Sequence, residues 1–291
     1  PPQSGMTVIE ALNILEFQNL SEMGDFAVNP STFHFMAETF KRAYSDRAEY
    51  LGDPAFSHIP VNILLSKEFA ESRFQTIDPT NVVPFNLREK PASSFLKNLK
   101  NEFDDRDGST THISIIDSEG NAVSLTQTLN HYWGSGITVC GFLLNNGMTS
   151  FSGESEAINR VESFKQPRTT IAPTMLFKNG KLFMVIGSPG AGRIISTLVE
   201  VICNAIDFDK SAGEANDAAR FHSRRMNEST TVEARFPKKL LDELESMGYQ
   251  FQVMGEMDNF FGGVQLIIVD HENHILIGSS DPRRSGVTQG Y

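Results

Sequence analysis

The stretch TTHISIIDSEGNAVSLTQTLN, residues 110–130, decides the fold because it predicts the element around which the rest of the chain can be arranged. Residues 112–117 alternate apolar and polar side chains as strands do, and residues 122–130 do the same. The intervening SEGN at 118–121 has the composition of a turn. The stretch therefore predicts a β-hairpin that begins with a threonine.

The segment before the hairpin, residues 81–109, is polar and lacks steady periodicity. Its last part, NEFDDRDGS at 101–109, predicts a solvated and mobile segment. Two interpretations stay open. The segment is either a linker that ends at a processing point or an ordinary surface loop, and composition alone favours the loop.

Helical and strand patterns flank the hairpin on both sides. Apolar spacing predicts helices at 6–17, 31–50 (starting near Ser31 or Thr32 as its cap), 63–74, 194–207, 211–219 and 237–247. The run KLFMVIGSPGAGR at 181–193 predicts a strand that enters a glycine-rich turn, and a late strand pair is expected at 264–269 and 274–278. Helices around β-hairpins predict a layered α/β or α+β architecture.

The composition excludes several classes of protein. The chain has 291 residues, of which 40% are hydrophobic and 21% charged, and this is typical of a globular protein. Its formal net charge of −11 argues against a nucleic-acid binder. No apolar run approaches the roughly 20 residues that span a bilayer. The opening PPQSG, residues 1–5, has no signal-peptide pattern and reads as the middle of a loop without an initiator methionine.

The two cysteines, Cys140 and Cys203, both lie beside apolar residues. We expect two buried free thiols rather than a disulfide. Because no histidine cluster accompanies them, we expect neither a metal site nor another cofactor.

Thr110 has the position that an N-terminal nucleophile requires. A threonine hydroxyl is a weak nucleophile and needs a base. If Thr110 became an N-terminus, its own α-amine, with a pKa near 8 in model compounds, could be that base. Such a residue needs a mobile segment before it and a rigid strand after it, and residues 104–109 and 110–117 predict this contrast.

A series of short motifs resembles the γ-glutamyltranspeptidase family over nearly the whole chain. The motifs that resemble the start of its small subunit are Thr110–Ser114, Gly120–Ser124, Thr126–Asn130, Leu143–Asn146, Ala172–Thr174, Gly187–Gly190, Arg220–His222 and Ser280–Arg283. Those that resemble the end of its large subunit are Pro1–Gly5, Leu12–Glu16 and Asp46–Pro54. Their common order makes the resemblance specific.

The resemblance implies an α+β fold, the αββα sandwich of N-terminal-nucleophile hydrolases. Residues 1–109 would be the C-terminal part of the large subunit, mostly helical and ending in a mobile linker. Residues 110–291 would be the small catalytic subunit, released by an autocatalytic cut between Ser109 and Thr110. The remainder of the large subunit would then be a partner of this chain.

The resemblance also implies the catalytic residues. Thr110 would be the nucleophile, and Thr128 would tune its hydroxyl by hydrogen bonding. The backbone N–H groups of Gly190 and Ala191 would form the oxyanion hole, where Ala191 replaces a glycine of the family. A glycine-rich turn that enters a helix can point N–H groups at one spot, and we expect Ala191 to serve if its φ is negative.

The expected substrate-binding residues depart from the family pattern. Asn130 matches the asparagine that holds the substrate α-ammonium, whereas Gly147 and Ser150 stand where a glutamine and an aspartate would. Ser150 can hydrogen-bond but brings no negative charge. The paired serines that hold the α-carboxylate appear here as Thr169 and Thr170, which keep the hydroxyls.

Two arginines suggest an acidic substrate. The stretches 260–265 and 283–284 resemble relatives that cut and transfer capsular poly-γ-glutamate. Arg193 and Arg284 would pair with substrate carboxylates, and the alternative for each is a structural salt bridge. We expect His112 and His222 to pack or hydrogen-bond rather than to act as bases.

The expected function is that of a γ-glutamyl amide hydrolase or transpeptidase that acts on a small-molecule or poly-γ-glutamyl substrate. One alternative is an acylase for glutaryl-type amides, since the weakened ammonium site would tolerate an acyl group without an amine. Another is a non-catalytic binding protein that kept the fold. The resemblance suggests a periplasmic, secreted or cell-surface location, and the sequence leaves a cytoplasmic one and a homo-oligomer open.

Overall fold

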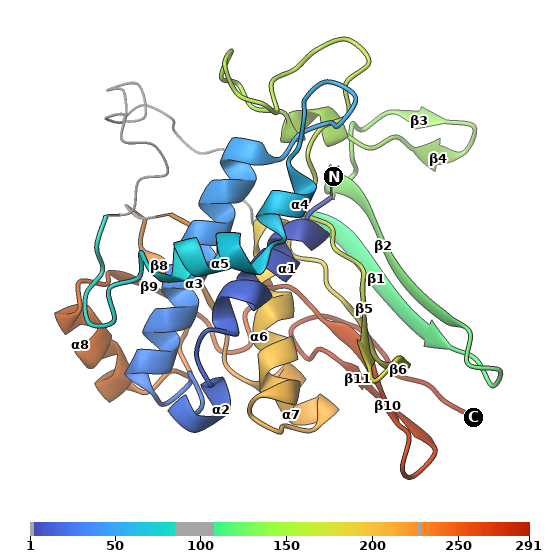
Figure 1. Ribbon diagram of the computed structural model, residues 1–291. Coiled ribbons are helices and arrows are strands. Elements are labelled where there is room, and N and C mark those ends of the chain that lie inside the picture. The colour runs from blue at the N-terminus through green and yellow to red at the C-terminus, as the bar shows by residue number, and fades with distance from the viewer. Residues whose placement is uncertain (1–2, 85–107, 226–227) are drawn as a thin grey trace.

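The structure is a computed structural model that describes residues 3–84, 108–225 and 228–291. Most of the predicted linker therefore lies outside the described residues. The predicted α+β class is confirmed, because a layer of helices covers one face of a four-stranded sheet and a long two-stranded hairpin lies on the other (Figure 1).

The helices before the hairpin largely follow the sequence pattern. They are α1 (Gly5–Leu15), α2 (Leu20–Met23), α3 (Pro30–Tyr50), α4 (Val61–Leu64) and α5 (Lys67–Phe74). The predicted cap of the second helix was wrong. The side-chain oxygen of Asn29 accepts from the N–H groups of Ser31 and Thr32, at 2.9 and 3.2 Å, and Pro30 takes the first helical position. The helix predicted at 63–74 is divided in two, because Ser66 caps α5 through a 3.1 Å bond from the N–H of Phe69.

The central sheet is antiparallel and has the strand order β11-β10-β6-β5. Its strands are β5 (Thr174–Lys178), β6 (Lys181–Gly187), β10 (Gln265–Asp270) and β11 (Ile275–Ser280). The helices α6 (Ile194–Ile206) and α7 (Ala212–Asp217) follow β6, and a smaller sheet of β7 (Phe221–His222), β8 (Thr230–Glu233) and β9 (Phe251–Met254) lies beside α8 (Lys238–Ser246). The later predicted helices and strands are thus confirmed to within a few residues.

The predicted hairpin is confirmed as β1 (Gly108–Ile116) and β2 (Ala122–His131), although β1 begins at Gly108 rather than at the threonine. Two serines fasten it to the central sheet. The Ser114 hydroxyl donates to the carbonyl of Gln265 at 3.0 Å, and the Ser124 hydroxyl donates to the carbonyl of Ile186 at 3.2 Å. On the other face of the hairpin, apolar side chains are 42–49% exposed, namely Ile113, Ile115, Val123 and Leu125. A short arm of β3 (Thr138–Val139) and β4 (Phe142–Leu143) projects beyond the end of β2 (Figure 1).

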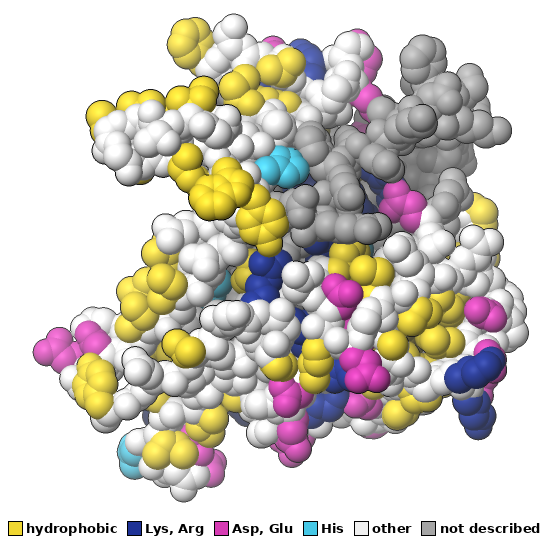
Figure 2. Space-filling view, turned by 180° about the vertical axis from the view of Figure 1, so that it is seen from behind, with side chains coloured by type: hydrophobic (Ala, Val, Ile, Leu, Met, Phe, Trp, Pro, Cys, Tyr) yellow, Lys and Arg dark blue, Asp and Glu magenta, His cyan; other side chains and the backbone are white. Residues whose placement is uncertain are grey.

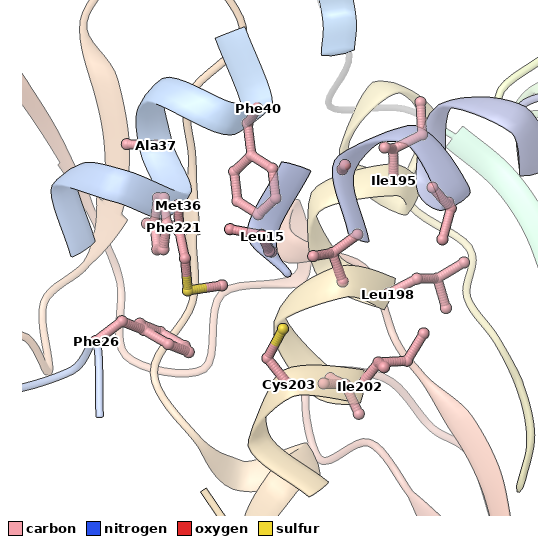
Figure 3. Close-up of a cluster of buried hydrophobic side chains, with 14 of the residues drawn as sticks. Leu15, Phe26, Met36, Ala37, Phe40, Ile195, Leu198, Ile202, Cys203 and Phe221 are labelled. Atoms are coloured by element: carbon pink, nitrogen blue, oxygen red, sulfur yellow. The ribbon is translucent and has the colours of Figure 1, made fainter. Parts of the chain in front are cut away.

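One hydrophobic core contains residues from both sides of position 110. Figure 3 shows Leu15 of α1 and Phe40 of α3 facing Leu198 and Ile202 of α6. The segments predicted as parts of two subunits are therefore packed together through buried apolar surface, the dominant favourable contribution to folding.

The expectation for the cysteines was half wrong. Cys203 is a buried free thiol in this core, whereas Cys140 is exposed at the tip of the β3–β4 arm, because the arm projects away from the core. None of the described helices is long and apolar enough to cross a membrane.

Candidate active site

Thr110, the predicted nucleophile, lies on β1 directly opposite Thr128 of β2. The Thr110 hydroxyl donates a hydrogen bond to the Thr128 hydroxyl oxygen at 2.9 Å. That oxygen also accepts from the backbone N–H of Asn130 at 2.8 Å. Since its lone pairs are then occupied, the Thr128 hydroxyl has one hydrogen left to donate, and the carbonyl oxygen of Ser109 lies 3.5 Å away. The Thr128 hydroxyl therefore contacts both the predicted nucleophile and the carbonyl of the predicted scissile bond.

A β-bulge in β2 lies across from the peptide bond that precedes Thr110. Gly108 pairs with His131. Two residues later Thr110 pairs with Thr128, so β2 carries one residue more than β1 over this span. Asn130, in the bulge, has a φ of +75°, a left-handed conformation that asparagine tolerates better than most residues. The bulge thus sets the local pairing at the point where the chain is predicted to be cut.

His112 lies between the hairpin and the central sheet. Its Nδ1 is 2.8 Å from the Thr126 hydroxyl and its Nε2 is 3.1 Å from the Ser114 hydroxyl. A Cβ on Gly187 would be 2.1 Å from the ring, so the glycine makes room for it. Burial lowers the pKa of His112 to about 4, and the ring is therefore neutral at pH 7. This geometry favours the packing and hydrogen-bonding role expected for His112.

The glycine-rich turn after β6, which contains Gly190, packs closely against the segment that contains Gly262 and Gly263. A Cβ on Gly190 would be 2.9 Å from the Cα of Gly262, and one on Gly262 would be 2.6 Å from the carbonyl oxygen of Pro189. The hydroxyl of Ser188 accepts from the N–H of Gly263 at 3.1 Å. These close approaches explain why both segments are rich in glycine.

The backbone at Ala191 does not meet the condition under which we expected its N–H to serve. Its φ is +48°, in the left-handed region, rather than negative. The preceding Gly190 has a φ of +137°, and Ala191 opens a short 3-10 helix, η4 (Ala191–Arg193), that leads into α6. A left-handed alanine stores of order 1 kcal/mol of strain, so the surroundings must hold it there. The roles of Gly190 and Ala191 as oxyanion donors stay a prediction.

Thr110 and Arg284 line one cleft of about 380 Å³, together with Pro189 of the glycine-rich turn and Gly263. The Arg284 side chain lies across Gly263, where a Cβ would be 2.7 Å from its Cγ and Cδ. Burial lowers the pKa of Arg284 from its usual value, yet arginine stays charged at any physiological pH. Arg284 therefore lines the same cleft as the predicted nucleophile, while its guanidinium donates to the backbone carbonyls of Gly262 and Asn259 at 3.4 and 3.3 Å.

A buried ion-pair network holds the backbone beside Arg284. Asp281 pairs with Arg220 at 2.6 Å and with Arg283 at 3.2 Å, and it accepts from the N–H of Val264 at 2.9 Å. Arg283 also pairs with Glu233 at 2.6 Å. The segments that carry Gly263 and Arg284 are thus tied together by buried charge-assisted bonds.

Arg193, the other predicted carboxylate ligand, is 2% exposed. Its guanidinium stacks 4.2 Å from the centre of the Phe260 ring, and its Nε donates to the Phe260 carbonyl at 2.8 Å. This buried placement favours a structural role for Arg193 over a substrate-binding role. The substrate-binding role stays a prediction.

Thr169 and Thr170 lie in an extended segment that the N-terminal region anchors. The carbonyl of Thr169 accepts from the Ser4 hydroxyl at 2.7 Å and from Arg47 at 3.3 Å. Arg47 also donates to the Ser4 hydroxyl at 2.8 Å. The backbone of the predicted carboxylate-binding pair is therefore fixed by residues on the other side of position 110.

The predicted ammonium-binding region combines Asn130 with the short helix η3 (Gly147–Ser150). The Asn130 amide donates to the Thr149 hydroxyl at 2.7 Å, and the Ser150 carbonyl accepts from Asn159 at 2.8 Å. Sequence reasoning missed Thr149, although a threonine beside the two altered positions Gly147 and Ser150 was a visible signal.

The projecting arm carries exposed apolar surface. Aromatic side chains near it are exposed, namely Tyr132, Trp133 and Phe142 at 51%, 74% and 60%. Figure 2 shows apolar side chains gathered on the arm above a hollow in this face, with basic side chains at the edge of the hollow. This face thus combines the apolar surface of the arm with basic side chains.

A family model described as gamma-glutamyltranspeptidase matches residues 1–291. The chain is 35% identical over 305 residues to the glutathione hydrolase proenzyme of Escherichia coli strain K12, which covers 100% of this chain and 50% of that protein. It is 30% identical over 293 residues to the capsule biosynthesis protein CapD proenzyme of Bacillus anthracis, which covers 98% and 49%.

A solved structure of cephalosporin acylase from Bacillus halodurans matches with a TM-score of 0.83 at 26% identity, over 100% of this chain and 50% of that one. The chain spans about half the length of the curated relatives that it matches.

Proposed function

The chain belongs to the gamma-glutamyltranspeptidase family, and from this membership we propose that it forms the catalytic part of an amidohydrolase that cuts itself before Thr110 and then acts on γ-glutamyl bonds. The observation that carries the proposal is the position of the Thr128 hydroxyl. It accepts from the Thr110 hydroxyl at 2.9 Å and lies 3.5 Å from the Ser109 carbonyl oxygen.

We propose that self-cleavage takes place in two chemical steps. The Thr110 oxygen attacks the carbonyl carbon of Ser109, the C–N bond breaks, and the Thr110 nitrogen takes up the proton that the hydroxyl loses. The product is an ester between Ser109 and the Thr110 side chain. The Thr110 α-amine is free once the ester has formed, and water then hydrolyses the ester to the Ser109 carboxylate and the Thr110 hydroxyl.

The freed amine then supports turnover of substrate. It accepts the hydroxyl proton as Thr110 attacks the γ-carbonyl, and it returns the proton to the leaving amine. Negative charge develops on the carbonyl oxygen, where backbone N–H groups from Gly190 and Ala191 would stabilise it. Water gives hydrolysis of the acyl-enzyme, and an acceptor amine gives transfer.

Intact-mass analysis and N-terminal sequencing of the full-length natural protein test the cleavage. We expect a chain that starts at Thr110. Thr110→Ala should stay uncut, whereas Thr111→Ala, which changes an exposed neighbour on the opposite face of the strand, should be cut as the natural protein is. A different new N-terminus, or cleavage of Thr110→Ala, would refute the assignment.

We propose that the donor is a γ-glutamyl group whose α-nitrogen carries no free ammonium, as inside poly-γ-glutamate. Gly147 and Ser150 offer no negative charge to an ammonium, whereas Arg284 shares the cleft with Thr110 and suits a carboxylate. A charge-assisted hydrogen bond contributes roughly 1.5–3 kcal/mol, so one missing partner shifts preference about 10- to 100-fold.

The preference is tested by kcat/KM for glutathione, a poly-γ-glutamate oligomer and a glutaryl anilide. The natural protein should favour the oligomer over glutathione. Ser150→Asp should move the preference back towards glutathione, and Arg284→Gln should lower kcat/KM mainly for the oligomer. A tenfold preference of the natural protein for glutathione would show that another residue holds the ammonium.

We further propose that the remainder of a large subunit covers the outer face of the hairpin. Ile113, Ile115, Val123 and Leu125 leave an apolar sheet face 42–49% exposed, and the curated relatives are about twice as long as this chain. Amide exchange of residues 110–130 should be slower in the full-length natural protein than in residues 1–291 alone. Equal exchange in the two proteins would contradict this partner.

A further inference from the structure

A single tyrosine from α3 reaches the turn that precedes α6. The hydroxyl of Tyr44 donates a 2.6 Å hydrogen bond to the carbonyl oxygen of Gly192. Both residues are buried, and the Tyr44 ring packs edge-on against His222 with centroids 5.4 Å apart. His222 is itself fixed by a 2.9 Å contact between its Nδ1 and the hydroxyl of Ser196.

The carbonyl that Tyr44 holds belongs to the same peptide unit as the N–H of Arg193. That N–H donates to the carbonyl oxygen of Gly190 at 3.0 Å. The Gly190 carbonyl in turn shares its peptide unit with the N–H of Ala191. Two peptide units therefore connect the Tyr44 hydroxyl to the N–H of Ala191 through two consecutive hydrogen bonds.

This connection bears on the strained backbone of Ala191. Rotating the Gly190–Ala191 peptide unit would let Ala191 leave its φ of +48° and would turn its N–H to the opposite side. The same rotation would break the bond from Arg193 to the Gly190 carbonyl. Hydrogen bonds in a chain also polarise one another, so a donor at the far end strengthens the donor at the near end.

We propose that Tyr44 is a positioning residue that holds the Ala191 N–H in its strained orientation through the Gly192–Arg193 peptide unit, so that this N–H can stabilise the reaction's oxyanion. The inference rests on the proposed function only for the role of the Ala191 N–H in stabilising the oxyanion. The relay itself is a property of the fold. It also places a determinant of catalysis in residues 1–109, on the opposite side of the predicted cut from the atoms that react.

Tyr44→Phe in the full-length natural protein removes the hydroxyl and keeps the ring against His222. Tyr249→Phe is the matched control, because Tyr249 is equally buried at 5% exposure and its hydroxyl contacts His34 at 2.9 Å, away from the turn. We expect Tyr44→Phe to lower kcat on a poly-γ-glutamate oligomer at least tenfold with KM within about twofold, since losing one oxyanion donor costs on the order of 10²–10³ in rate. The control should leave kcat unchanged.

Amide exchange at residues 190–193 provides a readout that does not depend on activity. Tyr44→Phe should speed exchange there and Tyr249→Phe should not. If the natural protein turns over no γ-glutamyl substrate, the proposed function is wrong. The exchange result would still show whether Tyr44 holds the turn through these hydrogen bonds. Equal exchange and equal kcat in the two variants would overturn the inference.

A second variant separates positioning from a loss of packing. Ala191→Gly removes the strain, because glycine adopts a positive φ without cost. In the Tyr44→Phe background it should restore part of the lost kcat. Strictly additive effects of the two substitutions would show that Tyr44 does not act through Ala191.

Discussion

His112 shows at the scale of one residue how a group beside the predicted nucleophile can be unsuited to act as a base. Both ring nitrogens contact hydroxyls of neighbouring strand residues, and burial lowers the pKa of the ring to about 4. In the unfolded chain a histidine titrates near 6.5. Between pH 6.5 and about 4, the His112 ring is therefore protonated in the unfolded state and neutral in the folded state.

This difference predicts how stability depends on pH. The contribution of His112 is fully present above pH 6.5 and is lost as pH falls from 6.5 towards about 4. The shift corresponds to about 3 kcal/mol of unfolding free energy over that window. Urea unfolding at pH 7.5, 6 and 5 should show a steeper loss in the natural protein than in His112→Gln. His222, whose pKa burial also lowers, contributes equally to both proteins and cancels in the comparison. Parallel pH profiles would contradict the prediction.

Other single residues mark the limit of what sequence could predict. The residue types at Thr110, Thr128 and Asn130 can be read from the motifs. The left-handed backbone at Ala191 cannot, because its surroundings include contacts between residues remote in sequence, such as the close approach of Gly190 to Gly262 and the bond from Tyr44 to Gly192. The same holds for Arg284, which reaches the cleft only because a buried ion-pair network fixes its segment.

At the scale of elements, the hairpin β1–β2 depends on hydroxyl groups for its attachment to the central sheet. The Ser124 hydroxyl donates to the Ile186 carbonyl at 3.2 Å and accepts from the N–H of Thr174 at 3.1 Å. A single hydroxyl thus links the strand of Thr128 to both β5 and β6. Alternation along β2 places Ser124 and Thr128 on one face, but it does not show which strands that face meets.

We predict that Ser124→Ala lowers the unfolding free energy by about 1–3 kcal/mol, because it leaves a backbone donor and an acceptor between the sheets without their partner. Ser135→Ala is the control, since the Ser135 hydroxyl donates to a carbonyl at 3.2 Å on the exposed arm. It should change stability by less than about 0.5 kcal/mol. Urea unfolding measures both variants. Equal effects would mean that the inter-sheet bond contributes no more than a surface bond.

The periodic elements were predictable because their patterns are local. The helices α1, α6 and α8 and the hairpin follow from apolar spacing within their own residues. The cap of α3 at Asn29 and the break at Ser66 were missed, because side-chain bonds rather than periodicity decide where those helices begin. The bulge at Asn130 was also missed, because the alternation of apolar and polar residues continues through it.

At the scale of the whole molecule, the two sides of position 110 form one body. Leu15 and Phe40 share a core with Leu198, and the Ser4 hydroxyl donates to the carbonyl of Thr169 at 2.7 Å. The Asp53 carboxylate accepts from the N–H of Gln166 at 2.7 Å. Cutting one peptide bond removes none of these contacts.

We therefore predict that the pieces ending at Ser109 and starting at Thr110 elute together from a size-exclusion column in native buffer, at the volume of uncut Thr110→Ala. They should separate only in denaturant. The buried apolar surface between them is the reason, since it is lost if they part. Separate elution in native buffer would show that the shared core does not hold the cut protein together.

The shared core also changes the order of the folding reaction. Before the cut, unfolding and refolding involve one molecule, and the midpoint temperature is independent of protein concentration. If the chain is cut as proposed, the same core has to be rebuilt from two molecules, so the midpoint rises with concentration and dilution favours the separated pieces. A cut protein that unfolds in a dilute environment would then no longer have the peptide bond that holds its two pieces together during refolding.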